Sequence, residues 1–339
     1  MNQPRRPATM ADVAALARVS HQTVSRVVNG DSRVRPATAQ RVNEAIRELG
    51  YRRNIAARLL ASSRSRTVGV VTWGSSQFGP SQVVLGLEKA ARSTDYRLSF
   101  VSIAETTPEA VQSAFDQLME NKPEAIIVIV PHETVLRIAQ DVALDVPTVL
   151  LEGDLSRTPL TAGVDNVQGA RLATRHLLDL GHTSVVHLAG PPGWNEAMAR
   201  IEGWRAELQA AGLHAPPLRW GGDWSAWSGY RAGIALAREK DVTAVFAAND
   251  QMALGLCAAL REQGRRVPED VSIVGFDDLP ESEFFAPALT TVRQDFWELG
   301  RRAMVLVERV LAGEENASVD LVPTTLIVRA STAPPPPSP

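Results

Sequence analysis

Polar side chains share one face of a short helical segment near the amino terminus, in the stretch SHQTVSRVVNG (residues 20–30). At helical spacing, one side carries Val24, Val27 and Val28. The polar side carries His21, Gln22, Ser25, Arg26 and Asn29. Arginine matches the two acceptors of guanine, and glutamine matches the donor and acceptor pair of adenine. The valine face therefore predicts burial, and the polar face predicts contact with a polar partner such as base edges.

Positive charge surrounds this segment. Residues 1–66 hold thirteen arginines and no lysine against four carboxylates, a net charge of +9. The rest of the chain holds the other 22 basic and 34 acidic residues, so the overall charge of −3 conceals a basic head and an acidic body. This division is typical of a module that binds a polyanion, carried on a larger domain. A solvated basic arm without a partner is the alternative.

A second group of polar residues lies next to predicted buried strands. Carboxylates, amides, an arginine and an aromatic face together suit a small ligand that both donates and accepts hydrogen bonds. Asp277 follows VSIVGF, Asn249 follows TAVFAA, and Arg200 follows the LAGPPG segment. Trp224, in GDWSAW, supplies an aromatic ring. Because an Asn-Asp pair after a strand is also a common turn and helix cap, that alternative stays open for Asn249.

Three short helices position the first group. Thr9 and Asp12 have the spacing of a capping box, which predicts that a helix starts there. A break over residues 18–20 separates this helix from a second one, which runs from His21 to about Asn29. A third helix starts at Pro36 and ends before Gly50. The pattern predicts an all-α helix-turn-helix module.

The second group belongs to a different kind of domain. From residue 66 onward, apolar runs alternate with helical stretches such as 82–92 and 107–121. This pattern predicts a doubly wound α/β body of two parallel-sheet lobes, with a ligand cleft at the carboxyl ends of the strands. The runs are TVGVV, RLSFV, AIIVIV, VPTVLL, SVVHLA, TAVFAA and VSIVGF.

The composition excludes several other classes. The chain has 339 residues, of which 45% are hydrophobic, and no apolar run long enough to cross a bilayer or to form a secretory signal, so we expect a cytoplasmic protein without a membrane partner. Its single cysteine, Cys257, cannot form an intrachain disulfide or thiolate cluster and fits a small buried residue. We expect no enzyme activity, no cofactor and no metal, because the sequence has no P-loop, no GxSxG motif and no histidine cluster.

Residues 8–330 resemble the lac repressor (LacI/GalR) family of transcriptional regulators. The resemblance is carried by MADVAALARVSHQTVSRVVNG, VRPATAQRVNEAIRELGY, GARLATRHLLDLGHTSVVHLAG, AANDQMALG, VSIVGFDD and LTTVRQDF. The stretches GPSQ, GDWSAWSGY, ANDQMALG and TTVRQDF resemble the lactose-responsive members most. The resemblance implies a repressor that binds double-stranded DNA at a pseudopalindromic operator as a homodimer. It also implies lobes like those of periplasmic binding proteins and a small carbohydrate effector, with a galactoside inducer expected.

The resemblance also divides the chain. Residues 1–53 would form the helix-turn-helix domain, 54–65 the hinge helix and linker, and 66–330 the effector-binding and dimerisation domain. The first lobe would comprise about 66–164 and 296–323, and the second about 165–293 and 324–330. Residues 331–339 end in TAPPPPSP, which predicts a disordered tail. No leucine heptad follows Arg329, so we expect dimers rather than tetramers.

For DNA, the resemblance places His21, Gln22 and Arg26 at the positions that read base edges. Phosphate contacts are expected from Ser20, Thr23, Ser25, Asn29 and Thr38. Thr9, Arg33 and Tyr51 complete the set in the head. In the hinge the implied residues are Asn54, Ala57 and Leu60. Leu60 is the expected minor-groove wedge, with ordinary packing as the alternative.

Three arginines depart from the family pattern. Arg18 replaces a glycine in the turn, Arg35 replaces a helix-capping hydroxyl, and Arg53 replaces a proline before the hinge. All three add positive charge, so we expect stronger nonspecific, salt-sensitive DNA binding. The change at Arg53 also weakens the expected start of the hinge helix.

For the effector, the resemblance implies that Asp277, Asn249 and Arg200 hold ring hydroxyls and that Trp224 covers the ring. Trp73 stands where the family has a small or polar residue, which would reshape the cleft. Glu152 or Asp154 would approach an outer hydroxyl, and the sequence leaves that choice open. Further expected contacts are Gly79, Val83, Gln294 and Phe296. The alternatives are a purine-responsive regulator of the same family and a sugar-binding transport protein, which would need a signal peptide and no DNA head.

Overall fold

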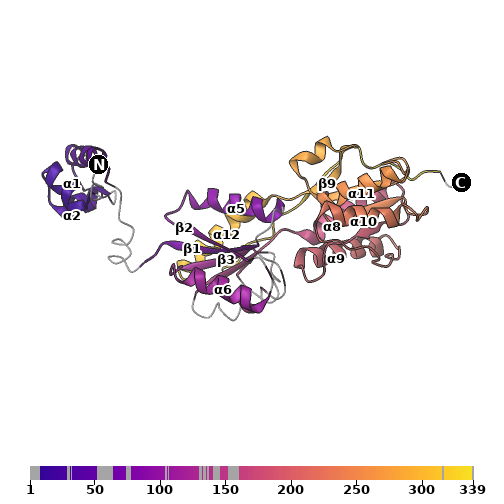
Figure 1. Cartoon of the computed structure of the whole chain (residues 1–339), viewed down its shortest axis with the longest axis horizontal. Coiled ribbons are helices and arrows are strands. Elements are labelled where there is room, and N and C mark those ends of the chain that lie inside the picture. Colours follow the sequence, from indigo (N-terminus) through magenta and orange to yellow (C-terminus); the bar gives the residue numbers. More distant parts are fainter. Residues whose placement is uncertain are drawn as a thin grey trace, which may run out of the picture. The chain divides into compact units, whose positions relative to one another are not determined.

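The computed structural model describes residues 8–28, 31, 33–51, 64–73, 78–103, 105, 107–129, 132, 135, 137–139, 146–151, 160–314 and 317–337. The chain forms two compact units, Met1–Arg64 and Ser65–Pro339 (Figure 1). The first unit is the helical head and the second is the α/β body, so each of the two groups of polar residues lies in its own unit.

The head contains three helices, as the sequence predicts. They are α1 (Met10–Ala17), α2 (His21–Val28) and α3 (Pro36–Leu49). Thr9 starts α1 with a complete capping box: its hydroxyl accepts the Asp12 N–H at 3.3 Å, and the Asp12 carboxylate accepts the Thr9 N–H at 2.7 Å. Ser20 accepts the Thr23 N–H at 3.1 Å at the start of α2. The buried core consists of Val13, Ala14, Ala17, Val24, Val42 and Ala45.

Two of the three arginines that depart from the family pattern, Arg18 and Arg35, occupy helix ends in the head. Arg18 ends α1 with a φ of +50°, a left-handed conformation that glycine adopts more easily, at a cost of about 1–2 kcal/mol for a residue with a side chain. Arg35 occupies the N-cap position of α3 and provides no side-chain cap, although Pro36 pre-sets the first helical turn. Gly50 ends α3 with a φ of +60°, as its position predicts.

The first lobe of the body is built on a parallel sheet in the order β2-β1-β3-β4-β5. Helices α5 and α12 pack on one face, and α6 packs on the other (Figure 1). The strands are β1 (Thr67–Trp73), β2 (Arg97–Ile103), β3 (Ala125–Ile129), β4 (Thr148–Leu151) and β5 (Thr161–Ala162). The helices are α5 (Phe78–Ala91), α6 (Pro108–Met119) and α12 (Phe296–Leu311). Every side chain of β3 and β4 is buried, as expected for strands covered on both faces.

The second lobe has a sheet in the order β10-β9-β8-β7-β6, in which only β10 is antiparallel to its neighbour. Helices α8 and α9 cover one face, and α10 and α11 cover the other. The strands are β6 (Val186–Leu188), β7 (Ala244–Ala247), β8 (Ser272–Asp277), β9 (Thr290–Arg293) and β10 (Thr325–Ile327). The helices are α8 (Asn166–Asp179), α9 (Asn195–Ala210), α10 (Ala226–Leu236), α11 (Asp250–Glu262) and the 3-10 turn η1 (Pro280–Phe284).

The chain passes between the two sheets three times: from β5 to α8, from β9 to α12, and from α12 to β10. At one crossing Val164 and Val322 form a parallel bridge. The predicted fold class, a helix-turn-helix head with two parallel-sheet α/β lobes, is confirmed. Cys257 is buried, in agreement with its predicted role. Within the described residues, no helix is long and apolar enough to span a membrane.

The start of the predicted disordered tail differs from that expectation. Ser331 is fully buried, and its hydroxyl donates to the Ile273 carbonyl at 2.6 Å and accepts the Thr290 N–H at 2.8 Å. The carbonyl of Ala333 accepts a hydrogen bond from the Ser272 hydroxyl at 2.8 Å. Because the proline run begins only at Pro334, residues 331–333 keep their backbone N–H groups. These residues form hydrogen bonds with the first residues of β8 and β9.

Candidate functional site

The polar face of α2 is exposed, as the helical spacing predicts. His21, Gln22 and Arg26 are all exposed, while Val24 on the opposite face is fully buried. The head core holds α2 through its valines, so the polar side chains remain available to a partner.

Other predicted DNA-binding residues of the head already have local partners. Thr9 belongs to the capping box of α1, and Tyr51 packs against the head core. The guanidinium of Arg33 binds the carboxylate of Asp31 at 2.9 and 2.8 Å, which holds the pKa of that carboxyl well below its usual range. Thr23, Ser25 and Thr38 are half-buried, and Ser20 is exposed.

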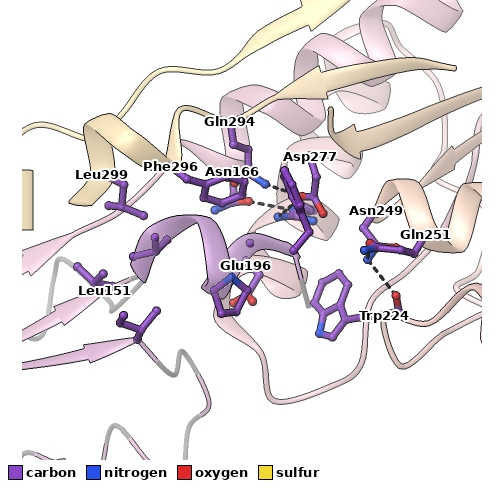
Figure 2. A pocket seen from close by; sticks show the side chains of 16 residues that line it. Leu151, Asn166, Glu196, Trp224, Asn249, Gln251, Asp277, Gln294, Phe296 and Leu299 are labelled. Atoms are coloured by element: carbon purple, nitrogen blue, oxygen red, sulfur yellow. Dashed lines mark hydrogen bonds and ion pairs between the residues drawn. The ribbon is translucent and has the colours of Figure 1, made fainter. Parts of the chain in front are cut away.

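A cavity lies in the body at the carboxyl ends of the strands. Ile129 ends β3, Leu151 ends β4 and Asp277 ends β8, and all three line it. The cavity lies where open α/β sheets bind ligands. Figure 2 shows Leu151, Phe296 and Leu299 on one side of it and Trp224, Asn249 and Asp277 on the other.

The two sides of the cavity differ in chemistry. Among the described residues, the first lobe contributes Phe78, Gly79, Pro80, Val83, Ile129, Leu151, Phe296 and Leu299, which are all apolar. The second lobe and the adjoining crossing segment contribute Asn166, Glu196, Arg200, Trp224, Asn249, Gln251, Asp277 and Gln294. Within the described part of the lining, the hydrogen-bonding groups therefore lie on one side of the space and the apolar groups on the other.

A buried polar cluster surrounds Asp277. The amide of Gln294 donates to its Oδ1 at 2.6 Å, and the Arg200 guanidinium lies 3.8 Å from the same oxygen. Burial raises the pKa of Asp277 to about 7, against the opposing effect of the positive charge on Arg200. Asp277 therefore changes protonation near neutral pH.

Arg200 is held in place by the lobe itself. Its Nε donates to Asn166 Oδ1 at 2.9 Å, and its Nη1 donates to the carbonyl of Ala248. The guanidinium also stacks 3.9 Å from the ring of Phe276. These contacts pre-organise the guanidinium beside Asp277.

Asn249 acts as a helix cap, the alternative that the sequence left open. Its Oδ1 accepts the Met252 N–H at 2.9 Å and so caps α11. Its Nδ2 donates to the Trp224 carbonyl at 3.0 Å and to Gln251 Oε1 at 2.9 Å. Both amide hydrogens are therefore engaged, and the second lone pair of Oδ1 is the part left for a ligand.

Trp224 forms the aromatic wall of the cavity. Its ring lies over Gly190, where a Cβ would come within 2.4 Å of it. The ring is perpendicular to that of Trp194 at 6.4 Å, and the Arg200 guanidinium lies 5.5 Å from its centre. The glycine of the LAGPPG segment thus makes room for the tryptophan.

Glu196 lies one helical turn before Arg200 on α9. Its Oε2 is buried and has no hydrogen-bond partner among the described residues. Burial raises the pKa of Glu196 to about 7, opposed by the charge of Arg200. The sequence analysis did not identify this residue.

Residues 9–54 match the family of bacterial regulatory proteins of the lacI type, and residues 174–332 match the periplasmic binding protein-like domain. The lactose operon repressor of Escherichia coli strain K12 is 35% identical over 333 residues, which are 97% of this chain and 92% of that protein. The chain belongs to the LacI family. It is a DNA-binding transcriptional repressor of that family with a ligand-binding domain.

Solved LacI-family structures share the fold. A lac repressor dimer bound to operator and the anti-inducer ONPF has a TM-score of 0.88 at 33% identity, covering 97% of this chain and all of that one. A complex of the regulator CelR with cellobiose has a TM-score of 0.71 at 33% identity, covering 96% of this chain and all of that one.

Most of the predicted effector residues line this cavity. They are Gly79, Val83, Arg200, Trp224, Asn249, Asp277, Gln294 and Phe296. Trp73 ends β1, and its side chain is outside the description. Glu152 and Asp154 lie outside the described residues, as do Asn29, Arg53, Asn54, Ala57 and Leu60.

Sequence reasoning missed several lining residues. The polar ones are Asn166, Glu196 and Gln251, and the apolar ones are Phe78, Pro80, Ile129, Leu151 and Leu299. Leu151 could have been found as the last residue of the predicted strand VPTVLL, and Ile129 as the residue before the end of AIIVIV. Glu196 lies four residues before Arg200, which places both on one helix face, but this spacing does not show that the face is buried.

Proposed function

We propose that this repressor acts in the cytoplasm as a homodimer whose two heads bind a pseudopalindromic operator, and that a small carbohydrate, a galactoside inducer, releases it. The observation that carries the effector assignment is the buried cluster of Asp277, Arg200 and Gln294 facing the ring of Trp224 in one cavity. Such a set supplies charged hydrogen-bonding groups for ring hydroxyls and a flat apolar surface for the ring.

On the DNA side, His21, Gln22 and Arg26 would read bases in the major groove. Their exposure on α2 supports this role, and each good bidentate pair discriminates by about 1–3 kcal/mol. Ser20, Thr23, Ser25 and Thr38 would contact phosphates together with Thr9, Asn29, Arg33 and Tyr51. Asn54, Ala57 and Leu60 would form the hinge contact in the minor groove.

In the cavity, Asp277 and Arg200 would hold ring hydroxyls, and Asn249 would accept one through its free lone pair. Trp224 would cover one face of the ring, and Phe296 with Val83 would close the apolar side. Because both lobes line the cavity, a ligand that fits one lobe arrangement better than another would shift the repressor toward it. By linkage the sugar would weaken DNA binding by the factor by which DNA weakens sugar binding, typically 1–3 kcal/mol.

The surface of the second lobe supports a dimer. Trp227 on α10 stacks on Tyr230 at 5.4 Å and is 65% exposed, and Phe284 in η1 is 79% exposed. Leu254 on α11 adds a further exposed apolar side chain. Exposed apolar groups of this size are typical of an interface, and we propose that they contribute to the contact between the two copies.

The test is a titration followed by tryptophan fluorescence, using galactosides, other pyranosides and nucleobases as separate probes. We expect a saturable response to galactosides that Asp277→Ala abolishes, and galactoside-induced release from operator DNA selected from a random pool. Asp241→Ala, outside the cavity lining, is the matched control and should bind normally. A response to nucleobases alone would replace the sugar assignment with the purine-responsive alternative.

A further inference from the structure

One carboxyl oxygen of Glu196, Oε2, is an unpaired hydrogen-bond acceptor among the described residues that line the cavity. Glu196 projects from the first turn of α9, and its Oε2 is buried. A buried acceptor left without a donor destabilises the folded protein, and native structures rarely keep one without a reason. A ligand that brings a donor to this oxygen would remove that destabilisation.

The charges of the cavity wall do not balance within the lining residues. Among the described lining residues, Glu196 and Asp277 are the acidic groups, and Arg200 is the basic group. Arg200 directs its Nε to Asn166 and its Nη1 to the carbonyl of Ala248, so much of its hydrogen-bonding capacity is used to hold it in the lobe. With both carboxyls ionised, these three groups leave an excess of one negative charge.

Building on the proposed sugar-binding function, we propose that Glu196 selects the effector by charge, so that the cavity prefers a sugar with an amino group facing Glu196 and excludes acidic sugars. An ammonium group carries three donors and a positive charge, so it would satisfy Oε2 and neutralise the excess charge. A phosphate or carboxylate would add a third anion to a buried space and would lose binding energy. A neutral hydroxyl would satisfy the acceptor without changing the charge.

The raised pKa of Glu196 agrees with this role. Because burial raises the pKa of Glu196 to about 7, part of the Glu196 carboxyl groups are protonated and uncharged at neutral pH. A bound cation would favour the ionised carboxylate instead. Arg200 and Asp277 are the charged groups of the lining that accompany Glu196, and both remain in the variants below.

The experiment compares neutral, amino and acidic sugars on the full-length protein at pH 7.5 by calorimetry. The probes are D-galactose and D-glucose, their 2-amino-2-deoxy and 6-amino-6-deoxy derivatives, and their 6-phosphates. We expect at least one amino derivative to bind about tenfold more tightly than its parent, and the phosphates to bind at least tenfold more weakly. Glu196→Gln keeps the side-chain shape and should reduce the amino preference below threefold.

Glu202→Gln is the matched control, because Glu202 is an exposed residue of the same helix and lies outside this cavity. It should keep the full preference of the unmodified protein. If parent sugars bind and Asp277→Ala abolishes that binding, but no amino derivative gains and Glu196→Gln changes no affinity, the inference is wrong and the proposed function stands. If none of the sugars binds, the proposed function fails, and this inference fails with it.

Discussion

Asp277→Asn should make the repressor more stable while removing its sugar response. In the folded protein burial raises the pKa of Asp277 from 3.8 to about 7. The unfolded chain releases this proton near pH 4, whereas the folded protein holds it until about pH 7. The part of the unfolding free energy that depends on a protonated Asp277 is therefore present at low pH, and it is lost as the pH rises from about 4 to about 7.

The size of this loss in unfolding free energy follows from the pKa shift of Asp277. About three pKa units at 1.36 kcal/mol each correspond to about 4 kcal/mol of unfolding free energy between pH 4 and pH 8. Asparagine has the same shape, still accepts the Gln294 hydrogen bond and tolerates the positive φ of +115° at this position. Because asparagine carries no charge, the unfolding free energy of the variant does not fall in this way as the pH rises. Its sugar affinity should fall because the charged acceptor is gone.

The assay is urea unfolding from pH 4 to pH 8 without sugar, with both proteins followed by tryptophan fluorescence. The free energy of unfolding of the variant minus that of the original should grow by about 4 kcal/mol over this range. Asp223→Asn is a control of opposite sign, because the Ser225 hydroxyl lowers the pKa of Asp223. Parallel pH profiles for the original and Asp277→Asn would refute the reasoning: Arg200 and Gln294 would then keep Asp277 ionised throughout.

Local contacts at Gly190, Ser331 and Thr9 can each be tested by one change in the chain. Gly190→Ala should weaken sugar binding at least tenfold, measured by fluorescence titration, because its Cβ would meet the Trp224 ring. Truncation after residue 330 should lower the free energy of unfolding by at least about 2–3 kcal/mol in urea, because it removes the two buried hydrogen bonds of the Ser331 hydroxyl and those between Ser272 and Ala333. Thr9→Ala should cost about 1 kcal/mol of α1 stability, seen as about fivefold faster amide exchange in that helix.

Local signals in the sequence predicted the head and the strands well. The start of α1 depends on Thr9 and Asp12, which are three residues apart, and the end of α3 depends on Gly50 alone. The long apolar runs became the central strands because they must be buried on both faces. Strands β5 and β10 have only two and three residues, so neither has a pattern long enough to detect.

The cavity could be predicted only in part, because its residues come from segments that meet in space. Asp277 was found from its place after a strand, and the family resemblance supplied Gln294 and Phe296. Glu196 was missed because a glutamate in the first turn of a helix is usually a solvated residue that suits the helix dipole. Its burial depends on the packing of α9 against the lobe, which no local pattern shows.

The residue type of Asn249 does not by itself distinguish a ligand contact from a helix cap. A sugar ligand and a helix cap both call for a side-chain amide after a strand, and the structure uses this residue for the cap, with both N–H groups engaged. The same bonds tie the Trp224 backbone to the start of α11. Asn249 therefore determines where the aromatic wall stands, and loss of sugar binding in an Asn249 variant would not by itself show that Asn249 touches the sugar. Asp277, whose bonds leave a charged group at the cavity, is the sharper probe of direct contact.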